Sequence, residues 1–324
     1  MTPAIETFSL AKRYRKVEAL KDLSLTVPTG TVCGFLGPNG AGKTTTMRIL
    51  MGLSRPSSGA AKMLGSSIDE EGLRIRSRVG YLSQDASFYP RFRVKDVLQF
   101  VARRYVSGSR REIAARVAET LEQVGLADRA KRRVKALSGG ERQRLGIGQA
   151  VIGRPDLLIL DEPSVGLDPE GRFQVLSLID SLREQMTVFY SSHLLDDVQR
   201  IADHVVILNE GEIIAQGPME EFLGSGAKYR VALDGNSSAT PSSSLAELPW
   251  VSAVTGVGGG AWDIEVSDQE AAERDLLRLL AKEHGPALRE LRPLVRSLEA
   301  VSYTHLTLPT KESRGWGGGG GGGG

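Results

Sequence analysis

The sequence predicts an α/β fold in which a parallel sheet carries a glycine-rich loop at the end of one strand. Three observations lead to this class. Residues 37–42 are a glycine-rich loop between an apolar run and a segment of helical composition. Residues 157–160 are a continuous apolar run that ends in two carboxylates, as expected of a strand buried on both faces of a parallel sheet. Residues 94–106 and 111–124 carry apolar side chains at helical spacing.

The expected elements follow one another along the first 220 or so residues. Strands are expected at 5–10, 20–27, 31–36, 79–83, 157–160 and 187–191. Helices are expected at 44–53, 94–106, 111–124, 139–152, 173–185 and 194–202. The turn residues Pro28-Thr29-Gly30 separate the second strand from the third. Residues 205–209 and 212–216 are predicted to form a hairpin around Glu210-Gly211.

The composition shifts after residue 224, and we divide the chain there. Residues 1–224 are predicted to form one domain and residues 225–300 a small α+β accessory domain. In the second unit we expect a strand at 229–233, a Ser-rich loop at 236–244, a hairpin of 251–257 with 261–266, and an amphipathic helix at 270–284. Residues 301–324 end in eight glycines, Gly317 to Gly324, and we interpret them as a non-native or disordered tail.

The composition of the 324 residues excludes several classes of protein. The single cysteine, Cys33, rules out an internal disulfide, a zinc cluster and an iron–sulfur site, and we expect it to be a small buried side chain. The net charge of +2 gives no electrostatic case for binding nucleic acid. No apolar stretch approaches the roughly 18–20 residues of a membrane helix, and no signal peptide is visible.

The strongest motif is the loop GPNGAGKT, which matches GxxxxGK[ST] in full between an expected strand and an expected helix. Glycines let several backbone N–H groups face one anion, and the helix N-terminus adds positive potential. Lys43 is expected to reach the β- and γ-phosphates of a nucleotide, and the Thr44 hydroxyl to bind Mg²⁺. The alternative is a glycine-rich turn that arose by chance. The predicted nucleotide-binding set is Gly37, Pro38, Asn39, Gly40, Ala41, Gly42, Lys43, Thr44 and Thr45.

Two carboxylates follow the apolar run 157–160. Because the carboxyl ends of parallel strands meet at one edge of a sheet, Asp161 is expected to lie where the phosphates bind and to hold Mg²⁺. Glu162 is expected to orient and polarise the attacking water. The alternative is a pair of carboxylates at a helix N-terminus before Pro163.

A second candidate anion site opens the helix expected at 139–152. Ser138-Gly139-Gly140 offers backbone N–H groups and a hydroxyl at a helix N-terminus. Glu141, three residues after Ser138, also fits a plain capping box. The two interpretations are compatible, because one helix end can be capped and still face a phosphate.

With these three motifs in order, the chain resembles the nucleotide-binding subunit of an ATP-binding cassette (ABC) transporter over residues 3–224. The motif 37–44 corresponds to Walker A, 137–141 to the signature and 157–162 to Walker B. The resemblance implies a P-loop NTPase core with an antiparallel β subdomain and a helical signature subdomain. It also implies a head-to-tail dimer with each ATP between Walker A of one subunit and Ser138, Gly139, Gly140 and Glu141 of the other.

The same resemblance assigns four weaker positions. Tyr14 matches the aromatic residue that stacks on adenine, and a surface aromatic in a basic run is the alternative. Gln84 matches a contact to Mg²⁺ and water. Asp168 matches the loop that crosses the dimer, with a turn residue before proline as the alternative. His193 matches the histidine that contacts the γ-phosphate, although a lone histidine is usually structural.

The resemblance implies ATP hydrolysis with ATP and Mg²⁺ as cofactors. The catalytic set would be Glu162, His193, Gln84 and Lys43, and the metal set Thr44, Gln84 and Asp161. It implies a separate membrane permease as partner, a second copy or a related ABC subunit, and a location at the cytoplasmic face of the membrane. The motif fragments and the added domain resemble the exporter branch. A soluble ABC ATPase that acts on ribosomes or DNA is the alternative.

Overall fold

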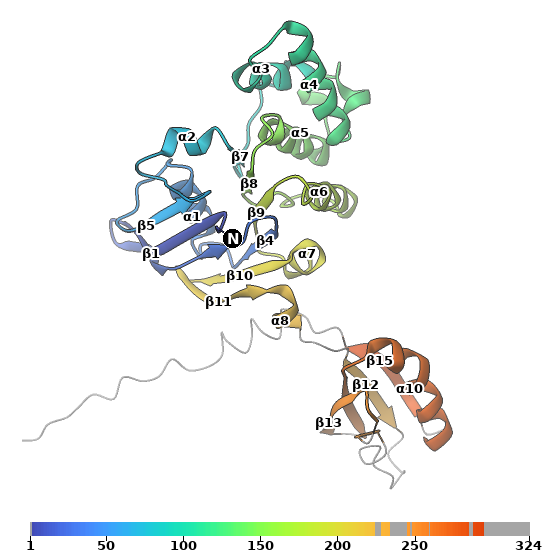
Figure 1. Ribbon diagram of the computed structural model, residues 1–324. Helices are drawn as coiled ribbons and strands as arrows, with labels where there is room; N and C mark the ends of the chain where they lie inside the picture. The colour runs from blue at the N-terminus through green and yellow to red at the C-terminus, as the bar shows by residue number, and fades with distance from the viewer. Residues whose placement is uncertain are drawn as a thin grey trace, which may run out of the picture.

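A computed structural model describes residues 2–223, 228–233, 245–246, 248–258, 260–284 and 288–294. The Ser-rich loop expected at 236–244 and the tail 301–324 lie outside the described residues. Two sheets and a set of helices form the part up to residue 223, and a third sheet with one helix follows it (Figure 1).

The central sheet has six strands in the order β11-β10-β4-β9-β8-β7. Its strands are β4 (Val32–Leu36), β7 (Val79–Leu82), β8 (Leu157–Leu160), β9 (Thr187–Ser192), β10 (His204–Asn209) and β11 (Glu212–Pro218). All neighbours pair in parallel except β10 and β11, which form the expected hairpin. Every residue of β4, β8 and β9 is buried, which explains the apolar run of β8 and the mostly apolar sequence of β4.

The second sheet is antiparallel and contains β1 (Ile5–Tyr14), β2 (Val17–Leu23), β3 (Thr26–Val27), β5 (Ser58–Met63) and β6 (Ser66–Ser67). The prediction of one strand over 20–27 is wrong, because β2 pairs with the second half of β1 and β3 with its start. The Thr7 side chain sits between them, accepting from Leu25 N and donating to Leu23 O. Strand β5 was not predicted, because its Ser, Gly, Ala and Lys residues have low strand propensity and form a strand here by pairing with β1.

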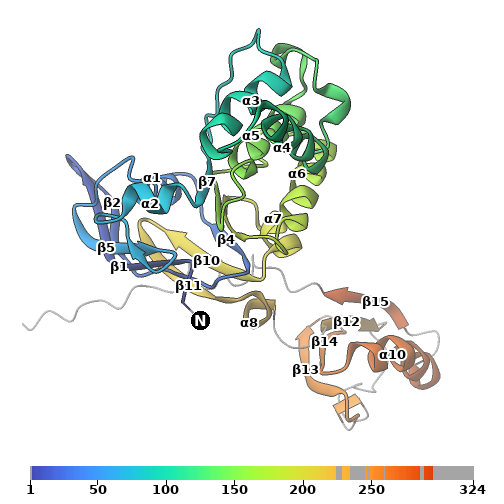
Figure 2. The same ribbon diagram turned by 45° about the horizontal axis from the view of Figure 1, so that its top comes forward.

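Helices lie on both sides of the central sheet (Figure 2). They are α1 (Lys43–Leu50), α2 (Gly72–Arg76), α3 (Val94–Tyr105), α4 (Arg110–Gln123), α5 (Gly139–Val151), α6 (Pro169–Ser181), α7 (Leu195–Ile201) and α8 (Met219–Leu223), with 3₁₀ turns η1 (Ala127–Arg129) and η2 (Val134–Ala136). Helix α6 begins four residues before the predicted start at 173. The Asp168 side chain accepts from Gly171 N at 3.1 Å, and Pro169 occupies the first helical position.

Alternate residues of the central strands feed two separate cores. Leu158 and Leu160 pack in a core with α3 to α7, whereas Leu157 and Ile159 pack in a core with α1 and the antiparallel sheet. Cys33 belongs to the second core and is fully buried, as expected. Burial, and then the nearby charge of Asp203, raise the pKa of its thiol. The motif loops therefore follow strands whose side chains are packed on both faces of the sheet.

The C-terminal part contains a four-stranded antiparallel sheet in the order β13-β14-β12-β15 and the helix α10. Its elements are β12 (Lys228–Leu233), β13 (Val251–Gly258), β14 (Ala261–Val266), α10 (Gln269–His284) and β15 (Leu288–Leu294). The strand β15 was not predicted. The core includes Val231, Trp250, Ile264, Leu276 and Leu280, and it shares no residue with the other two cores. No helix within the described ranges has both the length and the apolar character to span a membrane.

Because this core is separate, we propose that residues 225–300 are an independent accessory unit. A chain that ends at residue 224 is then expected to unfold within a few degrees of the main transition of a chain that ends at 300, which serves as the control. Differential scanning calorimetry measures both. A truncated chain that shows no cooperative transition would contradict the division.

Candidate active site

The glycine-rich loop leaves the carboxyl end of β4, and α1 begins at Lys43 directly after it. Gly40 and Gly42 have φ angles of +85° and +114°, in the region that side chains rarely adopt. A Cβ on Gly42 would lie 2.6 Å from Leu20 Cδ2 and 2.7 Å from Ala19 O. The loop can thus take this path only with glycine at position 42, which leaves its backbone free to face a ligand.

A cavity of about 300 Å³ opens beside this loop. It is lined by Ala19, Pro38, Asn39, Gly40, Gly42, Lys43, Thr44, Thr45, Gln84 and Glu162. Nine of these ten are residues predicted from the sequence, and Ala19 of β2 is the addition. Gly37 lies behind the loop, where a Cβ would collide with Leu208 O, and the 3%-exposed Ala41 is buried. These two predicted residues therefore support the loop from behind.

Lys43 lies inside the cavity wall and is only 5% exposed. Its Nζ donates to Gly37 O at 2.5 Å and to Pro38 O at 3.2 Å, so the side chain curls over its own loop. The same Nζ lies 3.1 Å from Glu162 Oε1. An ammonium group this deeply buried requires such acceptors, and a phosphate group is another acceptor of the same kind.

Asp161 stands at the carboxyl end of β8 and is fully buried. Its Oδ1 accepts from Ser191 Oγ at 2.8 Å and from Thr44 Oγ1 at 3.2 Å. Its Oδ2 is buried and has no hydrogen-bond partner among the described residues. Burial raises the pKa of Asp161, and the Glu162 charge adds to this, against the hydrogen bonds from Ser191 and Thr44. A buried carboxylate with one unpartnered oxygen beside a threonine hydroxyl fits the ligand chemistry of Mg²⁺.

Glu162 is held from both sides. Besides the Lys43 contact at Oε1, its Oε2 lies 2.9 Å from His193 Nδ1. Its backbone has a φ of +51°, which is rare outside glycine, and its N–H donates to Ser191 Oγ at 2.8 Å. This backbone turn aims the carboxylate into the cavity, where it can act on a water molecule.

Ser191 is a residue that the sequence reasoning missed. Its hydroxyl donates to Asp161 and accepts from Glu162 N, so one side chain sets the positions of both carboxylate residues. The run Ser191-Ser192-His193 at the end of a predicted strand was the available signal, but it was used only for His193.

Other predicted residues do not line this cavity. Tyr14 is at the end of β1, 44% exposed, with its Oη 3.4 Å from Ser54 Oγ and Lys12 Nζ 4.8 Å from its ring centroid. Asp168 caps α6. Ser138 caps α5, where its Oγ accepts from Glu141 N at 3.1 Å and Glu141 Oε2 accepts from Ser138 N at 2.8 Å. The structure thus confirms the capping box predicted for Ser138 and Glu141.

Helices α5 and α6 meet where both begin. A Cβ on Gly140 would lie 3.2 Å from Gly171 Cα, and one on Gly139 would lie 3.3 Å from Leu167 Cδ2. These glycines allow the N-terminus of α5 to pack on the segment that follows Asp168. The N-terminus of α5 and the segment around Asp168 are consequently packed against each other.

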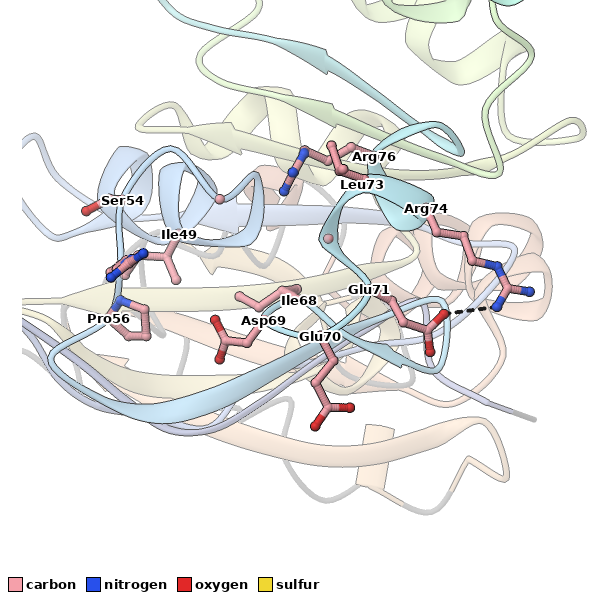
Figure 3. A pocket seen from close by; sticks show the side chains of 13 residues that line it. Ile49, Ser54, Pro56, Ile68, Asp69, Glu70, Glu71, Leu73, Arg74 and Arg76 are labelled. Carbon is pink, nitrogen blue, oxygen red and sulfur yellow. Dashed lines mark hydrogen bonds and ion pairs between the residues drawn. The ribbon is translucent and has the colours of Figure 1, made fainter.

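A second cavity, of about 870 Å³, lies between the end of α1 and α2 (Figure 3). Acidic side chains (Asp69, Glu70 and Glu71) and basic ones (Arg55, Arg74 and Arg76) line it together. Glu71 and Arg74 pair at 3.0 Å across its rim. Ser54 links it to Tyr14, but none of the predicted site residues lines it. This balance of charges favours no ligand class.

Comparisons with known proteins agree with this geometry. Residues 20–165 match the family model described as ABC transporter. The chain is 40% identical over 254 residues to an uncharacterised ABC transporter ATP-binding protein of Synechocystis. The alignment covers 75% of this chain and 71% of that protein. It is 37% identical to the bacitracin transport ATP-binding protein BcrA of Bacillus licheniformis, over 71% of this chain and 74% of that protein.

Solved structures give the same result for the fold. CbiO1 of Clostridium perfringens, part of an ABC transporter complex, aligns with a TM-score of 0.63 and 28% identity, over 68% of this chain and 90% of that chain. The cassette MJ0796 bound to ADP and phosphate aligns with a TM-score of 0.61 over 66% and 98% of the two chains. At 23% identity the second comparison speaks to the fold alone.

The raised pKa of Asp161 makes a testable difference to stability. Because the folded chain holds this proton more tightly than the unfolded chain, folding loses free energy as the pH rises from the ordinary aspartate pKa of about 4 through the raised value. In nucleotide-free protein with chelator, Asp161→Asn is expected to show a smaller fall, or a larger rise, in unfolding free energy from about pH 4 to about pH 7 than the unchanged chain.

Urea denaturation at the two pH values measures this difference, with Asp22→Asn, at an exposed aspartate, as the control. An identical pH dependence for the unchanged chain and Asp161→Asn would show that the pKa of Asp161 is not raised.

Proposed function

The chain belongs to the ABC transporter family as an ATP-binding subunit, and from that premise we propose that it powers export through a separate membrane permease. The observation that carries the proposal is the pairing of a phosphate-loop cavity with a second anion-binding helix end outside it. The direction of transport rests on the relatives, among them a linearmycin resistance ATP-binding protein and Nod factor export ATP-binding proteins. Relatives with these names give no support to a ribosome- or DNA-directed ATPase.

In this proposal the loop 37–44 binds the β- and γ-phosphates of ATP. Thr44, Asp161 and Gln84 would hold Mg²⁺, which neutralises charge on the transferred phosphoryl group when bound. The support for this metal set is the unpartnered Oδ2 of Asp161 and the contact of Thr44 with Oδ1. Gln84 lines the same cavity.

The residues around Glu162 divide the work of hydrolysis. Glu162 orients the water and accepts its proton, while His193, bonded to Oε2, fixes the carboxylate and faces the γ-phosphate. Lys43 contacts both the phosphate-binding loop and the proposed base, since its ammonium group lies between the loop carbonyls and Glu162. When the phosphates attract Lys43, Glu162 Oε1 is left available to bind the water.

The second anion site fits a head-to-tail dimer with a second copy or a related subunit. None of Ser138, Gly139 and Gly140 lines the cavity that Lys43 lines, as expected if this helix end serves the ATP of a partner subunit. Two ATP molecules between two subunits would favour the closed state only. A swing from mostly open to mostly closed requires about 5.5 kcal/mol of differential binding, which two buried triphosphates can supply.

We propose that the permease docks beside the Gln84 loop, which places the subunit at the cytoplasmic face of the membrane. Tyr89 and Phe92 are 75% and 45% exposed, with ring centroids 5.2 Å apart, and Phe100 of α3 is 64% exposed. Exposed aromatic side chains of this kind are typical of interfaces. Because they follow Gln84 within one loop and helix, a permease segment there could move Gln84 relative to the nucleotide.

Replacing the proposed base should separate ATP binding from hydrolysis. Glu162→Gln is expected to lower the hydrolysis rate by about 100-fold or more and to accumulate as an ATP-bound dimer, because closure no longer ends in product release. Size-exclusion chromatography with light scattering, with and without ATP, measures the dimer. Lys43→Ala is the matched control and should lose ATP binding itself. A Glu162→Gln chain that hydrolyses ATP as a monomer would refute the assignment.

The adenine-stacking role of Tyr14 also has a direct test. Tyr14→Ala should weaken ATP binding by about 1–3 kcal/mol, and Tyr14→Phe should not, because stacking needs the ring and not the hydroxyl. Phe8→Ala, at an aromatic residue of similar exposure on the same strand, is the control. Titration with a fluorescent ATP analogue gives the affinities. Equal affinities for Tyr14→Ala and the control would make Tyr14 a surface aromatic.

A further inference from the structure

The anion-binding end of α5 carries a negative charge of its own. Glu141 is the third residue of the helix, and its carboxylate is tied to Ser138 N at 2.8 Å. A carboxylate on the first turn lies within about one helical pitch, roughly 5 Å, of any anion bound there. The Glu141 carboxylate offsets part of the positive potential of the helix end and repels a second anion. The proposed contact with a partner's triphosphate thus needs a charge to offset Glu141.

Arg129 supplies that charge. Its Nε donates to Glu141 Oε1 at 2.8 Å, the oxygen that Ser138 does not use. The Glu141 side chain is 14% exposed and that of Arg129 35%, so water only partly screens the pair. Arg129 also pairs with the exposed carboxylate of Asp128.

The protonation states of both groups are consistent with a fully ionised pair. Partial burial acts to raise the pKa of Glu141, but the bonds from Arg129 and Ser138 N and the charges of Arg129 and Arg132 outweigh it and lower that pKa. The Glu141 bond and the Asp128 charge raise the pKa of Arg129.

The backbone around Arg129 is fixed relative to the helices. Val94 N donates to Arg132 O and Lys95 N to Ala130 O, both at 3.0 Å, which ties this segment to the start of α3. Arg129 N donates to Leu126 O at 3.0 Å, and Arg132 N donates to Arg129 O at 2.8 Å. The guanidinium group therefore approaches Glu141 from a rigid base and keeps its carboxylate turned toward Ser138.

We propose that Arg129 is a positioning residue for the ATP-binding end of α5. Its guanidinium group neutralises Glu141 and holds that carboxylate on the Ser138 cap, so that the N–H groups and the hydroxyl of Ser138 to Gly140 can face the triphosphate of the partner subunit. This role rests on the head-to-tail dimer proposed above.

The test measures ATP-driven dimerisation in Glu162→Gln chains, where hydrolysis does not reopen the dimer. Arg129→Ala is expected to weaken dimerisation about tenfold, because it leaves the Glu141 charge unpaired in a partly buried place. In chains that also carry Glu141→Gln, adding Arg129→Ala is expected to change dimerisation by less than about twofold. The helix end then has no carboxylate for Arg129 to neutralise, and the other partner of Arg129, Asp128, is 67% exposed and screened by solvent. Arg129→Lys, which keeps the positive charge, should recover most of the loss.

Two further measurements distinguish this role from a loss of structure. The matched control is Arg154→Ala, which removes another arginine–glutamate pair of the same helical region, with Glu119 at 2.7 Å, and should leave dimerisation unchanged. Raising the salt concentration from about 0.05 M to about 0.5 M should reduce the tenfold difference in dimerisation between the Arg129→Ala chain and its parent, since repulsion between charges is screened. ATP binding to the Arg129→Ala monomer should stay as in its parent, because Walker A is intact.

Equal losses from Arg129→Ala with and without Glu141→Gln, independent of salt, would overturn the proposal and make Arg129 a purely structural residue. No loss in either setting would overturn it as well. Failure of the parent Glu162→Gln chain to dimerise with ATP is a different result. It would refute the proposed dimer, and the charge of Glu141 would then not need to be neutralised.

Discussion

The site depends on the parallel register of three buried strands. Leu36 of β4 lies opposite Ser192 of β9, and Leu160 of β8 lies opposite Tyr190 of β9. The three strands therefore end side by side, and the segments that follow them converge. The glycine loop precedes the two carboxylates by more than 100 residues, and His193 follows Glu162 by 31 residues, yet all sit at one edge.

Buried charge at this edge explains much of the local geometry. Lys43, Asp161 and Glu162 are each 5% exposed or less, so two carboxylates face a single ammonium group. Hydroxyls of Thr44 and Ser191 stabilise one carboxylate, and Lys43 and His193 the other. One oxygen of Asp161 still has no partner among the described residues. A site with this excess of negative charge is suited to a divalent cation, which would offset the burial of Asp161 and the charge of a triphosphate.

Charge is arranged differently at the N-terminus of α5, which we propose faces the ATP of a partner subunit. There Glu141 is part of the helix cap, and Arg129 offsets it from a neighbouring turn. Packing of Gly140 against Gly171 joins this surface to the helix that Asp168 caps. The residues proposed to face a partner subunit thus lie together, outside the cavity that Lys43 lines. This separation fits the proposed mechanism, in which closure of the dimer brings residues of two chains onto each nucleotide.

The sequence alone was enough to identify the family, through the order and spacing of its motifs and the resemblance that they carry. The same motifs and resemblance predicted the site residues in the loop at 37–44, Asp161, Glu162 and His193. Short-range chemistry also predicted the Ser138–Glu141 cap. Tertiary structure alone decided the split of β2 from β3, the strand β5, and the contacts of Ser191 and Arg129. Each of these needs a partner from a distant segment: β1 for the strands, Asp161 for Ser191, and Glu141 across a turn for Arg129. Local propensity does not specify such partners, since hydrogen bonds and ion pairs between segments form only once the chain has packed.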